Sequence, residues 1–318
     1  MFLKLMFSSF HGIMEVFVIG ILGYIVISGF KQSSSLLDFL TKIVIRISLP
    51  CLIFSNMVTN FNPGEIEYWW IFPLLAVAVN IAGALLAGGY VLIDRTVQYR
   101  GEFMALVAFQ NGIFLPLAFA PVLFGHDSLP LFLNLLFLYN LLSIPTFFTL
   151  AVWMMNSTAG IGFRVKDFFS PPIVVTVFSF ILVLTGWSTT VPDWILRPVG
   201  TLGALTTPLS MLFVGGIIVT NLPKAKPDDW KEPLKITGLK SFLLPFIAAL
   251  IAFVFRPPQY IALFMIMQSV MPSALLTALI APDEGINRKT IAGAIMLTYG
   301  VSIVTIPLFM GIYGLLYG

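Results

Sequence analysis

The chain is built of ten long apolar stretches separated by short polar joints. A bilayer core about 30 Å thick is crossed by roughly 20 helical residues, which is close to the length of each stretch. With 58% hydrophobic and 10% charged residues, the chain carries more apolar surface than a soluble core of this size could bury. The sequence therefore predicts an all-α integral membrane protein with spans at residues 10–29, 37–59, 68–93, 102–124, 129–155, 171–187, 195–220, 236–255, 259–281 and 290–316.

The Lys and Arg residues predict the orientation of these spans. Of the 17 such residues, Lys4, Arg197 and Arg256 fall on one side of the ten-span plan, and all the others, Lys240 among them, fall on the opposite side. Positively charged joints stay on the cytoplasmic side of a membrane. The bias therefore predicts that both termini face outward. We expect the membrane to be a plasma membrane, of the bacterial inner-membrane type.

Several proline-containing segments recur in the same order in the second half of the chain. Pro50, a candidate hinge or helix break, corresponds to Pro208, and Pro116 corresponds to Pro272; LYNLLSIPTFF corresponds to LTYGVSIVTIPLF. Each half then holds five spans, and because five is odd the second copy must be inverted relative to the first. The alternative is that Pro and Gly are simply common in membrane helices. We predict two inverted five-helix repeats, at residues 1–158 and 159–318.

The fourth and ninth spans are each interrupted by proline beside amide side chains, in QNGIFLP at residues 110–116 and QSVMP at residues 268–272. Proline lacks an amide hydrogen and displaces the carbonyl one turn earlier, so each span frees backbone groups. Lipid does not satisfy such groups, but a substrate can. If the breaks meet, the half-helices that follow them point their positive ends at one place, which favours an anion. The alternative is a pair of ordinary proline kinks.

The candidate substrate-binding residues are the polar and flexible residues of the two breaks, Gln110, Asn111, Gly112, Pro116, Gln268, Ser269, Pro272 and Ser273. Two ionisable residues inside spans are further candidates, because charge within a bilayer is costly and often functional. Arg46 could meet an anion that enters from the cytoplasm, or belong to a paired interfacial helix face. Glu15 could carry a proton, or reach water near a helix end.

Other functional classes have little support in the sequence. The two histidines have no metal-ligand spacing and Cys51 is the single cysteine, so no metal site is expected. The sequence contains no HExxH, Walker-type glycine loop or GxSxG motif that would indicate hydrolysis or ATP-driven transport. The net charge of +3 comes without a basic run, so no nucleic-acid partner is expected. We expect neither enzyme activity nor a cofactor.

Taken together, the motifs resemble the auxin efflux carrier family. The resemblance rests on the ten-span plan, the Asn-Gly break of the fourth span, LPCLIF at 49–54, TPLSMLFVGG from Thr207, MPSA at 271–274 and VSIVTIPLF from Val301. It covers nearly the whole chain. The family includes plant PIN proteins and bacterial permeases for malonate, malate and related carboxylates. The short joint at residues 221–235 makes the bacterial permeases the better comparison.

The resemblance implies a fold similar to that of bile-acid sodium symporters. It implies a scaffold of spans 1, 2, 6 and 7 and a mobile transport unit of spans 3–5 and 8–10. Substrate would bind where the fourth and ninth helices cross, and the scaffold would form a homodimer. Asn111, Pro116 and Pro272 match family residues at this crossing.

The sequence therefore predicts a secondary active or facilitative carrier of small organic anions, the carboxylates, that works by alternating access. A coupling ion could be H⁺ or Na⁺. One alternative is a sodium-coupled organic-anion symporter that uses Gln110 or Gln268 as ion ligands. An alternative of another class is a membrane sensor or scaffold protein without transport. The expected partners are the anion, membrane lipid and a second copy of the chain.

Overall fold

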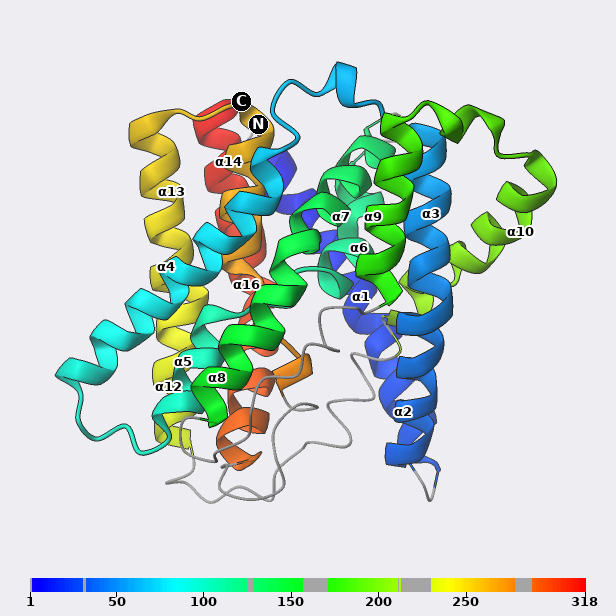
Figure 1. Ribbon diagram of the computed structural model, residues 1–318. Coiled ribbons are helices and arrows are strands. Elements are labelled where there is room, and N and C mark those ends of the chain that lie inside the picture. Colours follow the sequence, from blue (N-terminus) through cyan, green and yellow to red (C-terminus); the bar gives the residue numbers. More distant parts are fainter. Residues whose placement is uncertain are drawn as a thin grey trace.

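Helices make up nearly all of the described part of the computed structural model. The structure describes residues 2–30, 33–124, 128–156, 171–210, 212, 230–277 and 288–318. Most of the helices run side by side, and the two chain termini lie at the same end of the molecule (Figure 1).

Several helices are long and apolar enough to cross a membrane, which confirms the prediction of an all-helical membrane protein. Five such helices lie among the described residues, at Leu5–Ser28, Ile71–Ile93, Leu129–Met155, Lys231–Phe255 and Thr290–Tyr317. Shorter apolar helices lie at Val44–Asn60, Pro171–Leu184 and Gln259–Val270. Most of the boundaries differ from the predicted ones by a few residues, and the first helix begins at Phe2 rather than near residue 10.

The helices follow one another in two series. The first series is α1 (Phe2–Ser28), α2 (Ser33–Ile43), the π-helical turn η1 (Val44–Ser48), α3 (Leu49–Asn60), α4 (Ile71–Ile93), α5 (Arg100–Ala108), α6 (Phe114–Leu123), α7 (Leu129–Thr146), the π-helical turn η3 (Phe147–Ala151) and α8 (Val152–Asn156). The second series is α9 (Pro171–Leu184), α10 (Asp193–Ala204), α12 (Lys231–Gly238), the π-helical turn η7 (Leu239–Leu243), α13 (Leu244–Phe255), α14 (Gln259–Val270) and α16 (Arg288–Tyr317).

Prolines widen two of the helical segments without breaking them. Pro50 lies just after the π-helical turn η1, and Pro245 lies just after η7. Proline donates no backbone hydrogen bond and its ring crowds the carbonyl one turn earlier, and a π-helical turn accommodates both effects. Pro50 therefore lies in a widened but continuous helix, not at a break. Its expected counterpart, Pro208, lies in a short helical stretch at residues 206–210, which follows a turn at Leu205 after the end of α10 at Ala204.

The fourth and ninth predicted spans are interrupted, as expected. In the fourth span the chain is non-helical between the end of α5 at Ala108 and the start of α6 at Phe114. In the ninth span α14 ends at Val270, and the chain is non-helical from Met271 to Ala274.

Close approaches between helices require glycine at several positions, Gly83 and Gly203 among them. A Cβ on Gly83 of α4 would lie 2.8 Å from the Cα of Ala108, at the end of α5. A Cβ on Gly203 of α10 would lie 2.8 Å from the Cα of Leu52 in α3. Both distances are far shorter than a contact between two carbon atoms. Gly83 therefore allows α4 to pack directly against the first break.

Gly83→Ala is expected to lower the thermal stability of the protein in detergent, because the added Cβ must push α4 away from α5. Overpacking of this kind costs about 1–3 kcal/mol. Gly89→Ala in the same helix is the matched control, since a Cβ at Gly89 meets nothing within 4 Å. Melting curves of the purified variants measure the difference. Equal midpoints for the two variants would contradict the close contact.

A salt bridge ties the α4–α5 connection to α12. Lys235 Nζ donates hydrogen bonds to Asp94 Oδ2 over 2.7 Å and to Thr96 Oγ1 over 2.9 Å. Nearby, the backbone N–H of Gln98 donates to Glu232 Oε1 over 2.6 Å. The Lys235 ammonium and the hydrogen bonds from Thr96 hold the pKa of Asp94 well below its usual range. The charged form of Asp94 is therefore favoured by the fold.

Asp94→Asn is expected to lower the melting midpoint at neutral pH. Because the folded pKa of Asp94 is below the unfolded value of about 3.9, the stabilisation is present above pH ~4 and is lost as the pH falls through the folded pKa. Asp193→Asn is the control, because the Asp193–Arg197 pair is highly exposed and should contribute little. Melting midpoints at several pH values measure both. Equal melting midpoints of the two variants at every pH would show that the Lys235–Asp94 salt bridge does not stabilise the protein.

Candidate functional site

The two interrupted segments meet inside the molecule. Gln110 and Ser273 form an isolated antiparallel β-bridge. On one side of it the N–H of Asn111 donates to the carbonyl of Pro272 over 2.8 Å. On the other side the N–H of Ala274 donates to the carbonyl of Phe109 over 3.0 Å. The expected contact between residues 110–116 and 268–273 is confirmed.

The two prolines have different roles in this geometry. Met271 has an extended backbone (φ −58°, ψ 141°), as expected for a residue that precedes proline. Pro272 thus follows the end of α14, and its carbonyl bonds the first break. Pro116 lies in the first turn of α6, where a missing N–H breaks no helical hydrogen bond. Pro116 therefore helps to start α6 and lies outside the non-helical segment.

Gly112 allows two side-chain amides to approach the first break. The amide nitrogens of Gln268 and Asn140 each donate to the carbonyl of Gly112 over 3.1 Å. A Cβ on Gly112 would lie 2.9 Å from Gln268 Oε1. That oxygen is fully buried and has no hydrogen-bond partner among the described residues. A buried polar atom of this kind can accept a hydrogen bond from water or from a ligand.

Gln110 and Asn111 are each held by a buried tyrosine. Gln110 Nε2 donates to the hydroxyl of Tyr139, from α7, over 2.9 Å. Asn111 Nδ2 donates to the hydroxyl of Tyr299, from α16. Asn111 Oδ1 accepts from the backbone N–H of Phe114 over 3.2 Å, at the start of α6. Helices from both halves of the chain therefore fix the two amides.

A fully buried lysine lies beside Gln110. Lys240 Nζ, from η7, donates to Gln110 Oε1 over 3.4 Å. In the described part of the chain, no carboxylate forms an ion pair with Lys240. The Lys and Arg count placed Lys240 with the residues of the cytoplasmic side, but it did not predict that the side chain is fully buried inside the protein. The helical segment that contains Lys240 begins at Lys231 rather than near residue 236.

The two serines of the second break bond protein groups. Ser273 Oγ donates to the carbonyl of Leu106 over 2.7 Å, and the Ser273 N–H donates to Thr298 Oγ1 over 3.3 Å. Ser269 Oγ donates to the carbonyl of Met265, within α14, over 2.6 Å. Ser273 therefore stabilises the crossing, whereas the Ser269 hydroxyl bonds its own helix.

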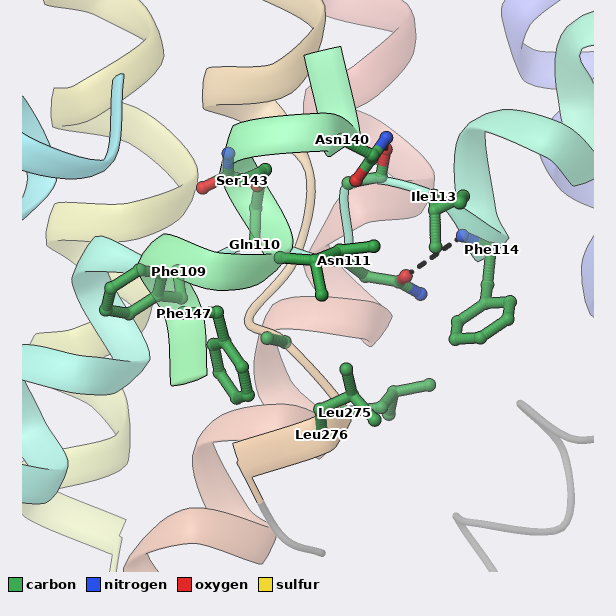
Figure 2. Close-up of a pocket in the computed structure, with 13 residues that line it drawn as sticks. Phe109, Gln110, Asn111, Ile113, Phe114, Asn140, Ser143, Phe147, Leu275 and Leu276 are labelled. Atoms are coloured by element: carbon green, nitrogen blue, oxygen red, sulfur yellow. Dashed lines mark hydrogen bonds between the residues drawn. The ribbon is translucent and has the colours of Figure 1, made fainter. Parts of the chain in front are cut away.

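A small pocket lies beside the crossing (Figure 2). Its volume is about 40 Å³, space for a few water molecules. Figure 2 shows the hydrogen bond from Phe114 to Asn111 at one side of the pocket, so the N-terminus of α6 lies at the pocket. The corresponding start of the second half of the ninth span lies mostly outside the described residues. The lining residues are Phe109, Gln110, Asn111, Gly112, Ile113, Phe114, Asn140, Ser143, Ile144, Phe147, Ala274, Leu275 and Leu276.

The two ionisable candidates do not line this pocket. Glu15 on α1 and Arg46 in η1 are both exposed. In the part of the chain that the structure describes, no three His, Cys, Asp or Glu side chains form a group that could hold a metal ion. The basic side chain beside the crossing is that of Lys240.

Flanking helices complete the site with residues that the sequence analysis missed, namely Tyr139, Asn140, Lys240 and Tyr299. Three of them lie in the segments LYNLLSIPTFF and LTYGVSIVTIPLF, which were identified as repeated but given no role. For Lys240 the available signal was a lysine inside the predicted span 236–255. The local sequence does not show that these side chains point at the fourth span.

Two curated proteins are similar to this chain over most of their length. A protein of Methanothermobacter thermautotrophicus, described as an uncharacterized transporter, is 24% identical over 313 residues, which cover 95% of this chain and 97% of that protein. A second uncharacterized transporter, from Methanocaldococcus jannaschii, is 24% identical over 285 residues, which cover 85% of this chain and 87% of that protein.

A family model described as a membrane transport protein matches the chain twice, over residues 8–164 and 159–310. The two matches divide the chain close to the predicted repeat boundary and support an internal repeat. Together they cover nearly the whole sequence, including both interrupted helices. The chain therefore belongs to the membrane transport protein family, the family of the auxin efflux carriers.

Proposed function

We propose that the protein carries small organic anions, specifically carboxylates, across the membrane by alternating access at the helix crossing. That it is a membrane transporter follows from its family. The anionic cargo is inferred from one observation: the buried amine of Lys240 bonds Gln110, and Gln110 lines the small amide-containing pocket beside the two interrupted helices. The transport is secondary active or facilitative.

Electrostatics favour an anion at this position. An unpaired ammonium inside a membrane span is costly, and an anion bound beside Gln110 would offset that cost. The N-terminus of α6 adds the positive end of a helix dipole next to Asn111. No Asp or Glu appears among the residues that line the pocket in the described structure. A cation would meet repulsion from a charged Lys240 and no carboxylate among the described residues that line the pocket.

The repeat architecture gives a route for the movement. We propose ten spans in two inverted five-helix repeats, with a boundary near residues 158–159 that lies outside the described residues. Spans 1, 2, 6 and 7 form the scaffold, and spans 3–5 and 8–10 form the mobile unit. The double family match and the crossing of the fourth and ninth spans support this arrangement.

The proposed setting is a plasma membrane, with both termini on the outer side and the scaffold paired in a homodimer. The Lys and Arg distribution supports the orientation. Apolar side chains on α1 and α9 of the scaffold are exposed in the single chain, including Val18, Ile21, Ile25, Phe178 and Ile181. Lipid or a second copy would cover these faces.

Flux measurements in liposomes test the cargo. Purified protein is reconstituted and given mono- and dicarboxylates and their neutral amide analogues, under imposed H⁺, Na⁺ and potential gradients. Saturable uptake of carboxylates, but not of the amides, is expected. A sodium requirement would favour the symporter alternative. Uptake of the amides or of cations without carboxylate uptake would refute the proposal.

Lys240→Gln is expected to reduce carboxylate uptake about tenfold or more, which corresponds to the loss of about 1.4 kcal/mol of binding. The physical reason is the loss of the positive charge beside Gln110. Lys240→Arg keeps the charge and should retain more uptake. Lys235→Gln is the matched control, because Lys235 bonds Asp94 and not the crossing. Equal uptake by Lys240→Gln and Lys235→Gln would contradict the role of Lys240.

Gly112→Ala is expected to impair transport while leaving the protein folded. The new Cβ would lie 2.9 Å from Gln268 Oε1, so the Gln268 amide must move and weaken its bond to the Gly112 carbonyl. Initial uptake rates and size-exclusion profiles separate transport from folding. Gly89→Ala, where a Cβ meets nothing within 4 Å, serves as the control. A wild-type uptake rate in Gly112→Ala would show that the bond between Gln268 and Gly112 is not needed for transport.

A further inference from the structure

Asparagine side chains connect α3 and α7 among apolar neighbours. Asn56 of α3 donates from its amide to Asn134 Oδ1 over 2.9 Å and to the carbonyl of Pro130 over 3.2 Å. Asn134 is fully buried and Asn56 is 8% exposed. Ile53 and Leu135, which adjoin these residues in α3 and α7, belong to the main apolar core.

A second asparagine lies one helical turn farther along α3. Asn60, the last residue of α3, is exposed and donates to Asn56 Oδ1 over 3.1 Å. Residues four apart lie on the same helix face, about 6 Å along the axis. The helix α3 therefore presents two amides in a row, and Asn134 bonds the first. The Nδ2 of Asn134 has no hydrogen-bond partner among the described residues.

The position of Asn60 indicates the direction in which α7 would move along α3. The end of α3 at Asn60 lies at the same end of the molecule as both termini, which is the outer end in the proposed orientation (Figure 1). A shift of α7 toward that end by one turn would carry Asn134 from Asn56 to Asn60. The same shift would carry Tyr139 and Asn140, which α7 contributes to the crossing.

We propose that Asn56 and Asn60 are two successive partners for Asn134, and that α7 moves along α3 by about one helical turn when the carrier changes access. The inference rests on the proposed function, in which α3 belongs to the scaffold and α7 to the mobile unit. Unpaired amides are costly inside a membrane, so positions between the two partners are unfavourable. Two discrete positions one turn apart follow, as in other helix shifts between packed elements.

Disulfide cross-linking in liposomes tests the step. In a Cys51→Ser background, which removes the single cysteine, Asn134→Cys is combined with either Asn56→Cys or Asn60→Cys. A disulfide needs Cα atoms about 4.4–6.8 Å apart, so each pair reports one position. Asn134→Cys with Thr59→Cys is the matched control, because Thr59 is adjacent to Asn60 but points about 100° away around the helix.

Both asparagine-derived pairs are expected to form disulfides, and either disulfide is expected to stop transport until it is reduced. The control pair is expected to form far less product. Cross-linking of the Asn56 pair alone, in a protein whose unlinked form still transports, would overturn the step. A Thr59 pair that forms as readily as the Asn60 pair would overturn it as well. Size-exclusion profiles verify that each variant is folded.

Single substitutions provide a second measurement. Asn60→Leu removes the second partner together with the hydrogen bond that Asn60 donates to Asn56, so a several-fold slower transport rate is expected, whereas Asn60→Gln keeps an amide and should largely restore the rate. Wild-type rates in Asn60→Leu would overturn the proposal.

Cross-linking does not depend on the cargo. If both asparagine-derived pairs form but no carboxylate moves, the step is supported and the proposed cargo is refuted. If carboxylates move but the Asn60 pair does not form, the cargo is supported and the step is refuted.

Discussion

The backbone bridge between Gln110 and Ser273 holds the two interrupted helices together where each has lost its own hydrogen-bond ladder. Inside a membrane every backbone N–H and C=O group needs a partner within the protein. Each break supplies hydrogen-bond partners for backbone groups of the other. Burying either break alone would therefore leave more backbone groups unpaired, at a higher free-energy cost. The positions of α5, α6 and α14 all follow from this mutual satisfaction.

Groups from four other segments then stabilise the crossing. Tyr139 from α7 and Tyr299 from α16 bond the amides of the first break, and Asn140 bonds its backbone. The turn η7 brings Lys240 beside Gln110. On the remaining side, Gly83 allows α4 to pack directly against the backbone at the end of α5. The site is thus a polar cluster enclosed by apolar helices, and its basic residue, Lys240, comes from outside the breaks.

The sequence could predict the breaks because their causes are local. Proline is disfavoured inside a helix and tolerated at its ends, and in both spans it follows amide side chains: Pro272 comes after the end of α14, and Pro116 lies in the first turn of α6. The same reasoning was less successful at Pro50, where a π-helical turn keeps the helix continuous. It did not predict the burial of Lys240 beside the crossing, because burial inside the protein depends on how the helices pack against one another.

The sequence by itself determined the all-helical membrane class and indicated the two places where helices are interrupted. Both follow from local quantities, namely the length of apolar stretches and the chemistry of proline. Only the tertiary structure decided that Lys240, Tyr139 and Tyr299 surround the crossing. The physical reason is that an apolar side chain is satisfied by lipid or by any apolar neighbour, whereas a buried polar group needs one correctly placed partner, which can lie more than a hundred residues away, as Tyr299 does from Asn111.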